Sequence, residues 1–116
     1  MPIVYFSQKG ARTADGFLTT DTNPPNNVFG RRNLPTQQNL APGDYIFTCE
    51  ATDAVDTKFT ATVSGGAVAT QDGTITGPAG TVATESVDVP FTVPADLGAG
   101  SNQAGQNLPQ AGGNAT

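Results

Sequence analysis

Histidine and tryptophan are absent from this chain of 116 residues, which contains one cysteine and one methionine. The missing histidine removes the side chain that most often acts as a general acid or base near neutral pH. A single cysteine cannot form an intrachain disulfide, and without histidine the common ligand sets of zinc cannot be assembled. The composition therefore predicts a protein that is not an enzyme and carries no cofactor.

Two possibilities for chemistry remain, a cysteine nucleophile and a calcium site. Cys49 lies on the side of an alternating segment that we expect to face the core, where a cysteine acts as a small apolar residue. Asp44, Glu50, Asp53 and Asp56 supply carboxylate oxygens within 13 residues, but they lack the spacing of a calcium-binding loop. We expect Asp53 and Asp56 to accept backbone hydrogen bonds in a loop, with calcium binding as the alternative.

Long apolar runs are also missing, and their absence bears on location. No stretch approaches the roughly 18 apolar residues of a membrane helix. The first ten residues, MPIVYFSQKG, lack the basic start, the apolar run and the cleavage site of a secretory signal. We expect a soluble protein that is made in the cytoplasm and has no membrane partner.

The charge is acidic overall and unevenly distributed. A net charge of −5 and a pI of about 4.2 argue against nucleic-acid binding, which needs clustered cations to neutralise phosphates. Residues 1–33 nevertheless carry a net charge of +2, whereas residues 34–116 carry −7. Such asymmetry is typical of a segment that lies on an acidic partner, although solvated basic loops are an equal alternative. The cations concerned are Lys9, Arg12, Arg31 and Arg32.

Residues 44–94 have the pattern of short strands. Apolar residues alternate with polar ones along Tyr45–Ala51 and again along Phe59–Val63, so these apolar members are expected to face a core. The segment Val87–Val93 presents a third apolar face. Pro90 within it indicates an edge strand, because proline cannot donate a hydrogen bond to a neighbouring strand.

Turn signals separate these strands. Gly65-Gly66 and Asp72-Gly73 are both typical of two-residue hairpins, and their close spacing predicts a tight antiparallel meander. Gly77–Gly80 indicates a further turn. Regular spacing of turns between short strands predicts an all-β fold, a small antiparallel β-sandwich or barrel that is immunoglobulin-like or related.

The flanking regions differ from this centre in composition. Residues 1–43 contain one short strand signal at Ile3–Phe6, followed by turn formers such as Asp15-Gly16, and we expect an extended, ordered N-terminal arm. Residues 95–116 are rich in Gly, Ala, Asn and Gln. They predict a C-terminal arm that is either disordered or ordered on a neighbouring subunit through Leu97 and Leu108.

Association with other chains is expected because the core is thin. Leu, Ile, Val and Phe make up about a fifth of the residues, near the lower limit for globular proteins. A small domain with few apolar residues gains stability when it binds a partner. The candidate partner-binding residues are Lys9, Arg12, Arg31, Arg32, Leu97 and Leu108.

One segment resembles a known module. PGDYIFTCEATD, followed by KFTATVSGG, resembles the late strands of bacterial and phage immunoglobulin-like modules, in which a proline-glycine turn leads into a strand that bears a tyrosine. The resemblance covers residues 42–66. Tyr45 lies four residues before Cys49 and there is no second cysteine, which excludes a disulfide-linked immunoglobulin domain.

The whole chain resembles the capsid cement or decoration proteins of tailed bacteriophages. It shares their profile, being short, acidic, rich in Thr and Gly and without catalytic residues. The resemblance implies a β-domain on the outside of the virion, often a homotrimer, that ties neighbouring major capsid subunits together. The alternatives are another structural subunit of a phage particle, such as a neck, tail or head-fibre protein, and an adhesion or carbohydrate-binding module.

Overall fold

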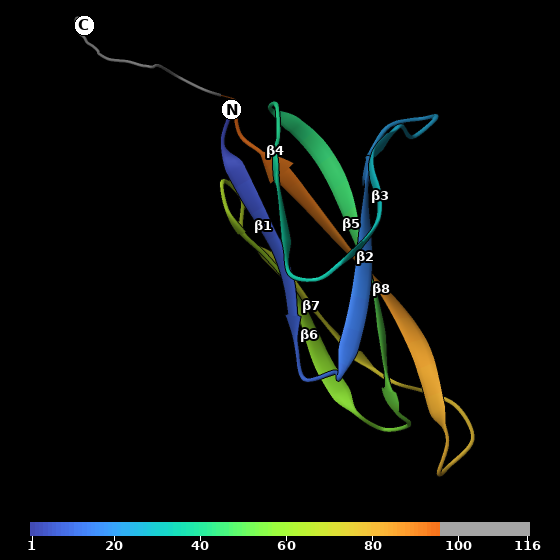
Figure 1. The fold of residues 1–116 in the computed structure, drawn as a ribbon. Coiled ribbons are helices and arrows are strands. Elements are labelled where there is room, and N and C mark those ends of the chain that lie inside the picture. Colours follow the sequence, from blue (N-terminus) through green and yellow to red (C-terminus); the bar gives the residue numbers. More distant parts are fainter. Residues whose placement is uncertain (96–116) are drawn as a thin grey trace, which may run out of the picture.

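Two four-stranded antiparallel sheets pack face to face in the computed structural model, which describes residues 1–95 (Figure 1). Sheet A has the strand order β4-β1-β6-β7, and sheet B has the order β3-β2-β5-β8. The predicted all-β sandwich is therefore confirmed. The strands are β1 (Ile3–Lys9), β2 (Thr13–Thr20), β3 (Asn27–Asn33), β4 (Thr36–Asn39), β5 (Gly43–Ala54), β6 (Lys58–Gly65), β7 (Ala69–Thr74) and β8 (Val82–Val93).

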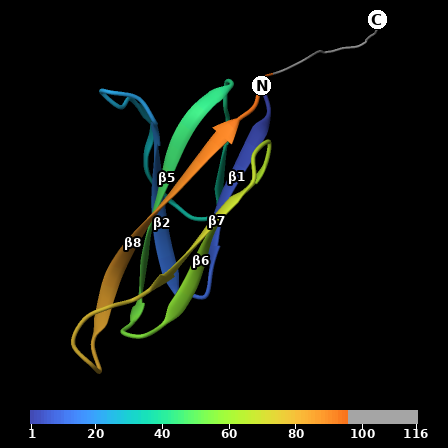
Figure 2. The same ribbon diagram turned by 180° about the vertical axis from the view of Figure 1, so that it is seen from behind.

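The two halves of the chain follow the same path. The half β1–β4 crosses from sheet A to sheet B, turns back through the β2–β3 hairpin and returns to sheet A, while β5–β8 begins and ends in sheet B (Figure 2). If every strand is exchanged for the one four positions away in the chain, each sheet order becomes the other. The halves join through the central pairs β1–β6 and β2–β5.

The core lies between the sheets and is rich in phenylalanine. The inward positions predicted on β5 and β6 are all buried, and Phe47, Cys49 and Ala51 have no exposed surface. Phe6 from sheet A contacts three aromatic rings of sheet B, with centroid distances of 4.9 Å to Phe47, 5.4 Å to Phe29 and 5.9 Å to Phe91. Because Phe6 and Phe29 come from the N-terminal half, the core depends on both halves.

Tyr45 anchors the point where the chain passes from β4 into β5. Its hydroxyl donates a 2.7 Å hydrogen bond to the carbonyl oxygen of Ala41, four residues earlier. Immunoglobulin-like sandwiches use a similar bond at one corner. The strand order is not that of an antibody domain, in which the first two strands are neighbours in one sheet; here β1 and β2 lie in different sheets.

The expectation of an N-terminal arm with one short strand is wrong. The predicted strand is present as β1, but residues 1–43 supply three further strands, and every one pairs within a sheet. β2 is a central strand of sheet B, with Leu18 fully buried. Its polar and glycine-containing sequence, TADGFLTT, lacks the regular apolar alternation of the central strands, and one of its two partners, β5, lies more than 20 residues further along the chain.

Both Asp-Gly dipeptides lie inside strands, so the two-residue turn predicted at Asp72-Gly73 is wrong, as is the turn signal at Asp15-Gly16. Each glycine makes room for an aromatic ring. A Cβ atom on Gly16 would lie 2.4 Å from the Phe47 ring, and one on Gly73 would lie 2.5 Å from the Phe59 ring. Glycine in a strand commonly marks such a close approach.

The other turn predictions have mixed outcomes. β6 and β7 form a hairpin at Gly65-Gly66, where Gly65 has a φ of 86°, but the loop also includes Ala67 and Val68. β7 then crosses to β8 in the other sheet through the predicted turn at Gly77–Gly80, which excludes a simple meander.

Pro90 lies on β8, an edge strand of sheet B, as predicted. The C-terminal arm, including Leu97 and Leu108, lies outside the described residues except for Ala95.

Candidate functional site

The outward side chains of β1, β6 and β7, which we call face A, change in character from one end to the other. Val4 and Phe6 point into the core, so Ile3, Tyr5 and Lys9 point outward along β1. Ile3 and Tyr5 are 39% and 46% exposed. Face A therefore has an apolar end near the N-terminus and a basic end where β1 finishes.

The basic end contains a shallow groove of about 370 Å³. Lys9 on β1 is the register partner of Thr60 on β6, and Lys58 lies two residues before Thr60 on β6. Both lysines therefore flank Thr60 in the groove. The Thr60 hydroxyl donates a 2.8 Å hydrogen bond to the Asp72 carboxylate. Within residues 1–95 neither lysine lies within ion-pair distance of a carboxylate. The outward side chains that line the groove are Lys9, Lys58, Thr60, Asp72 and Thr74.

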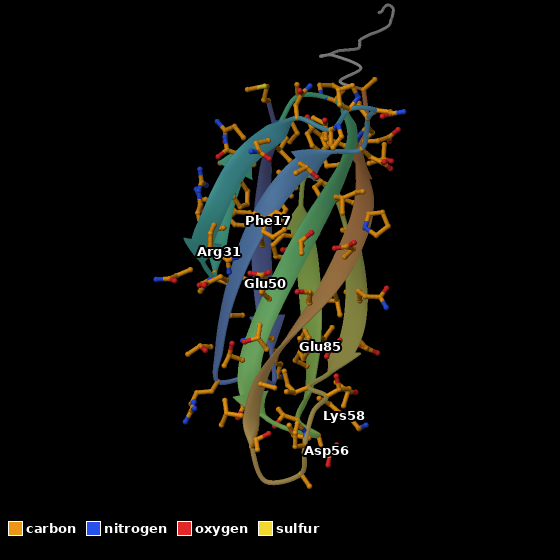
Figure 3. The ribbon with its side chains drawn as sticks, turned by 90° about the vertical axis from the view of Figure 1, so that its right-hand side faces the viewer. Phe17, Arg31, Glu50, Asp56, Lys58 and Glu85 are labelled. Carbon is orange, nitrogen blue, oxygen red and sulfur yellow. The ribbon has the colours of Figure 1, made fainter. Side chains whose placement is uncertain are left out.

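The outward side chains of β2, β3, β5 and β8, which we call face B, lie on the side of the molecule that faces the viewer in Figure 3. Several of them bond to one another. The Thr48 hydroxyl donates to Asp88 at 2.8 Å, and the Thr92 hydroxyl donates to Asp44 at 2.6 Å. A third pair joins the hydroxyls of Thr52 and Thr84 across the same two strands. These bonds tie β5 to β8 and satisfy polar groups that would otherwise be available to a partner.

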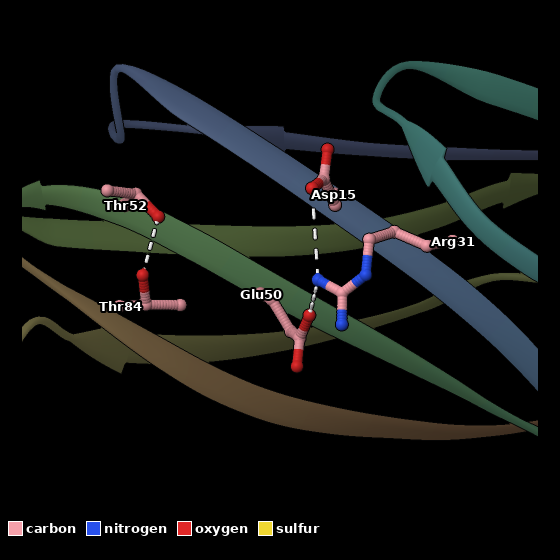
Figure 4. A network of polar contacts seen from close by, with 5 residues as sticks. All are labelled: Asp15, Arg31, Glu50, Thr52 and Thr84. Carbon is pink, nitrogen blue, oxygen red and sulfur yellow. Dashed lines mark hydrogen bonds and ion pairs between the residues drawn. The ribbon is translucent and has the colours of Figure 1, made fainter.

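Arg31 belongs to this internal network. Its guanidinium forms an ion pair with Glu50 and lies 3.8 Å from the Asp15 carboxylate (Figure 4). These residues come from three neighbouring strands, because Asp15 and Glu50 are register partners on β2 and β5. The structure thus gives this candidate partner-binding residue two acidic neighbours within the chain.

Arg32 also makes contacts within the chain. Its guanidinium carbon lies 4.2 Å from the centre of the Phe29 ring, and one of its nitrogens donates to the carbonyl oxygen of Gln37 at 3.3 Å. It covers the edge of the sandwich between β3 and β4. A cation over an aromatic face is a stabilising contact that needs no partner protein.

The remaining candidate cations lie at one end of the molecule. Arg12 is in the loop between β1 and β2, where its backbone N–H donates to Asp53 at 2.8 Å, and its side chain is exposed. Lys9 is three residues earlier, at the groove. Lys58 was not among the predicted residues, since its separation from Lys9 in the sequence gives no sign that the two face one groove.

Cys49 is unsuited to act as a nucleophile. Burial, followed by the negative charge of the neighbouring Glu50, raises the pKa of its thiol to about 11. The reactive thiolate is therefore almost unpopulated near neutral pH. Its predicted inward position is confirmed.

The carboxylates considered for calcium bind different partners within the chain. Asp53 accepts backbone hydrogen bonds from Arg12 and Ala54, as expected, although it lies on β5 and not in the predicted loop. Asp44 accepts from Thr92, and Glu50 pairs with Arg31. In the part of the chain that the structure describes, no three His, Cys, Asp or Glu side chains are grouped as metal ligands.

Comparisons with known proteins give no relative: no family model matches the chain, and neither a curated protein nor a solved structure is detectably similar to it. Residues 1–95 contain no apolar helix of membrane-spanning length. The site must therefore be interpreted from its own chemistry.

Proposed function

We propose that this protein is a non-enzymatic structural protein of a virion, and that it binds the outside of a tailed-phage capsid and cements neighbouring major capsid subunits. Face A is the binding face in this proposal. The protein acts as a homo-oligomer, with a trimer favoured, and it needs no cofactor.

The observation that supports this proposal is the difference between the two sheet faces. Face A exposes apolar side chains at one end and, at the other, two lysines that lie beyond ion-pair distance of any carboxylate in residues 1–95, a combination that suits a protein interface. Face B has most of its charged and hydroxyl groups bonded to one another. A domain with one unsatisfied face suits attachment to a larger surface.

Binding to capsids tests the proposal directly. The genes beside this one should encode a portal, a head protease or a major capsid protein, and heads assembled from that capsid protein should retain the purified chain on sedimentation. Charge reversal by Lys9→Glu with Lys58→Glu should abolish retention. Retention equal to that of the wild type would remove face A from the proposal, and neighbouring genes unrelated to virions would remove the capsid.

Two further measurements address the arms and the oligomer. Truncation of residues 95–116 should weaken retention if Leu97 and Leu108 contact the capsid, as the sequence predicts. Light scattering should show association of the isolated protein, and a monomer at high concentration would contradict the trimer.

An adhesion or carbohydrate-binding module remains the second candidate, and one observation favours it. Tyr5 is 46% exposed on face A, and an exposed ring is the usual platform for a sugar. Tyr45 does not add to it, because its ring is buried. Screening of immobilised glycans with wild type and Tyr5→Ser would separate the two: binding lost in the variant favours adhesion.

A further inference from the structure

We propose that the groove at the basic end of face A is a carboxylate site that receives an acidic side chain from a protein partner. This inference rests on the proposed function, because it names the chemistry by which face A recognises its partner.

The arrangement of charge in the groove carries the inference. Lys9 and Lys58 flank Thr60. The one carboxylate that lines the groove, that of Asp72 on β7, accepts a hydrogen bond from the Thr60 hydroxyl. Two ammonium groups against one carboxylate leave the groove with a charge of +1 on a protein whose net charge is −5. Two like charges on one groove favour an added anion.

The shape and donors of the groove limit the kind of anion. A volume of about 370 Å³ is at the small end for a binding pocket and suits one or two side chains. The Thr74 hydroxyl has no bonding partner within residues 1–95 and can donate to a bound oxygen. Two ammonium groups and one hydroxyl match the acceptor-only oxygens of a carboxylate.

A protein carboxylate is favoured over a nucleic acid as the ligand. A polyanionic backbone needs many cations along its length, and the Asp72 carboxylate within the groove, together with the acidic surface of face B, repels it. Arg12 is exposed on the loop that follows β1 and can pair with a second acidic residue of the partner, next to the one bound in the groove. The partner is therefore expected to present a short acidic segment.

Nuclear magnetic resonance of the full-length, ¹⁵N-labelled chain tests the site, with acetylated tetraglutamate as the probe and tetraglutamine as its neutral match. Tetraglutamate should shift the backbone amides of Thr60, Asp72 and Thr74, and tetraglutamine should not. Lys9→Gln with Lys58→Gln should weaken tetraglutamate binding roughly fivefold to tenfold. Asp72→Asn, which keeps an acceptor for Thr60, should strengthen it roughly twofold to fivefold.

Arg31→Gln is the matched control, since it removes a cation from face B and should leave the affinity unchanged. Unshifted groove amides, or equal affinity in the double lysine variant, would overturn the proposal. Inorganic phosphate that shifts the same amides more strongly would overturn the choice of a carboxylate. A wild-type chain that binds capsids but not tetraglutamate would remove only this site. A wild-type chain that binds tetraglutamate but not capsids would remove the capsid function.

Discussion

Faces A and B belong to four-stranded sheets with equivalent strand orders, yet their cationic side chains differ, because Arg31 on face B is paired within the chain and the two lysines of face A are not. On face B, Arg31 pairs with Glu50, and threonine hydroxyls bond across β5 and β8. On face A, Lys9 and Lys58 face one groove without an acidic neighbour in ion-pair range. Internal pairing stabilises the fold, whereas unpaired groups remain available, so the two faces should respond differently to substitution.

The largest effect should come from Gly16, whose substitution disturbs the packing under both faces at once. Gly16→Val places a branched side chain where a Cβ atom alone would lie 2.4 Å from the Phe47 ring and 3.1 Å from Leu34. Phe47 is fully buried and cannot move away, so overpacking should lower the free energy of unfolding by about 3 kcal/mol. Urea unfolding measures this change.

Gly30 provides the control for Gly16. It lies on β3, and no atom of another residue lies within 4 Å of the position that a Cβ atom would take there. Gly30→Ala should therefore change stability by less than about 0.5 kcal/mol. Equal effects at the two glycines would show that strand propensity, and not the aromatic ring, sets the requirement at Gly16.

Cys49, beneath face B, should make stability depend on alkaline pH. Its folded pKa of about 11 lies above the unfolded value of 9.0, so the folded state holds the proton more tightly. Its contribution is complete below pH 9 and is lost as the pH rises toward 11, by on the order of 2 kcal/mol. Unfolding of wild type and Cys49→Ala from pH 8 to 11 should reveal a difference that shrinks with pH; parallel curves would contradict it.

Charge reversal on face A should separate binding from stability. Lys9→Glu with Lys58→Glu should remove binding to capsids while the free energy of unfolding stays within about 0.5 kcal/mol of the wild type, because both side chains are exposed. Sedimentation with heads and urea unfolding measure the two quantities. A large loss of stability would mean that the lysines support the fold, which this structure does not predict.

A small effect on stability, and none on binding, should come from Arg31 on face B. Arg31→Gln removes an ion pair whose arginine side chain is 59% exposed, and it should lower stability by at most about 1 kcal/mol. Capsid binding should be unchanged. High salt should reduce the difference from the wild type, and weakened capsid binding in this variant would show that face B also takes part in the contact.

Features that depend on local geometry were predicted from the sequence, whereas those that depend on pairing between strands were not. Alternation along Tyr45–Ala51 and Phe59–Val63 identified inward positions correctly, because the two-residue period of a strand is a local property. Strands β2, β3 and β4 were not predicted; β2, for example, is held by β3 and β5, and nothing within TADGFLTT indicates those neighbours. The pairing of Arg31 with Glu50 was likewise not predicted, since the two residues lie 19 positions apart and meet only because β2 pairs with both β3 and β5.

What could be read directly from the residues was the all-β class, the inward faces of the central strands, the edge position of Pro90 and the buried thiol of Cys49. Each follows from local geometry or from the chemistry of one side chain. Tertiary pairing decided the rest. It placed Gly16 and Gly73 under aromatic rings, joined Arg31 to Glu50, and brought Lys9 beside Lys58, because contacts between distant strands depend on register and sheet order that no short stretch of sequence encodes.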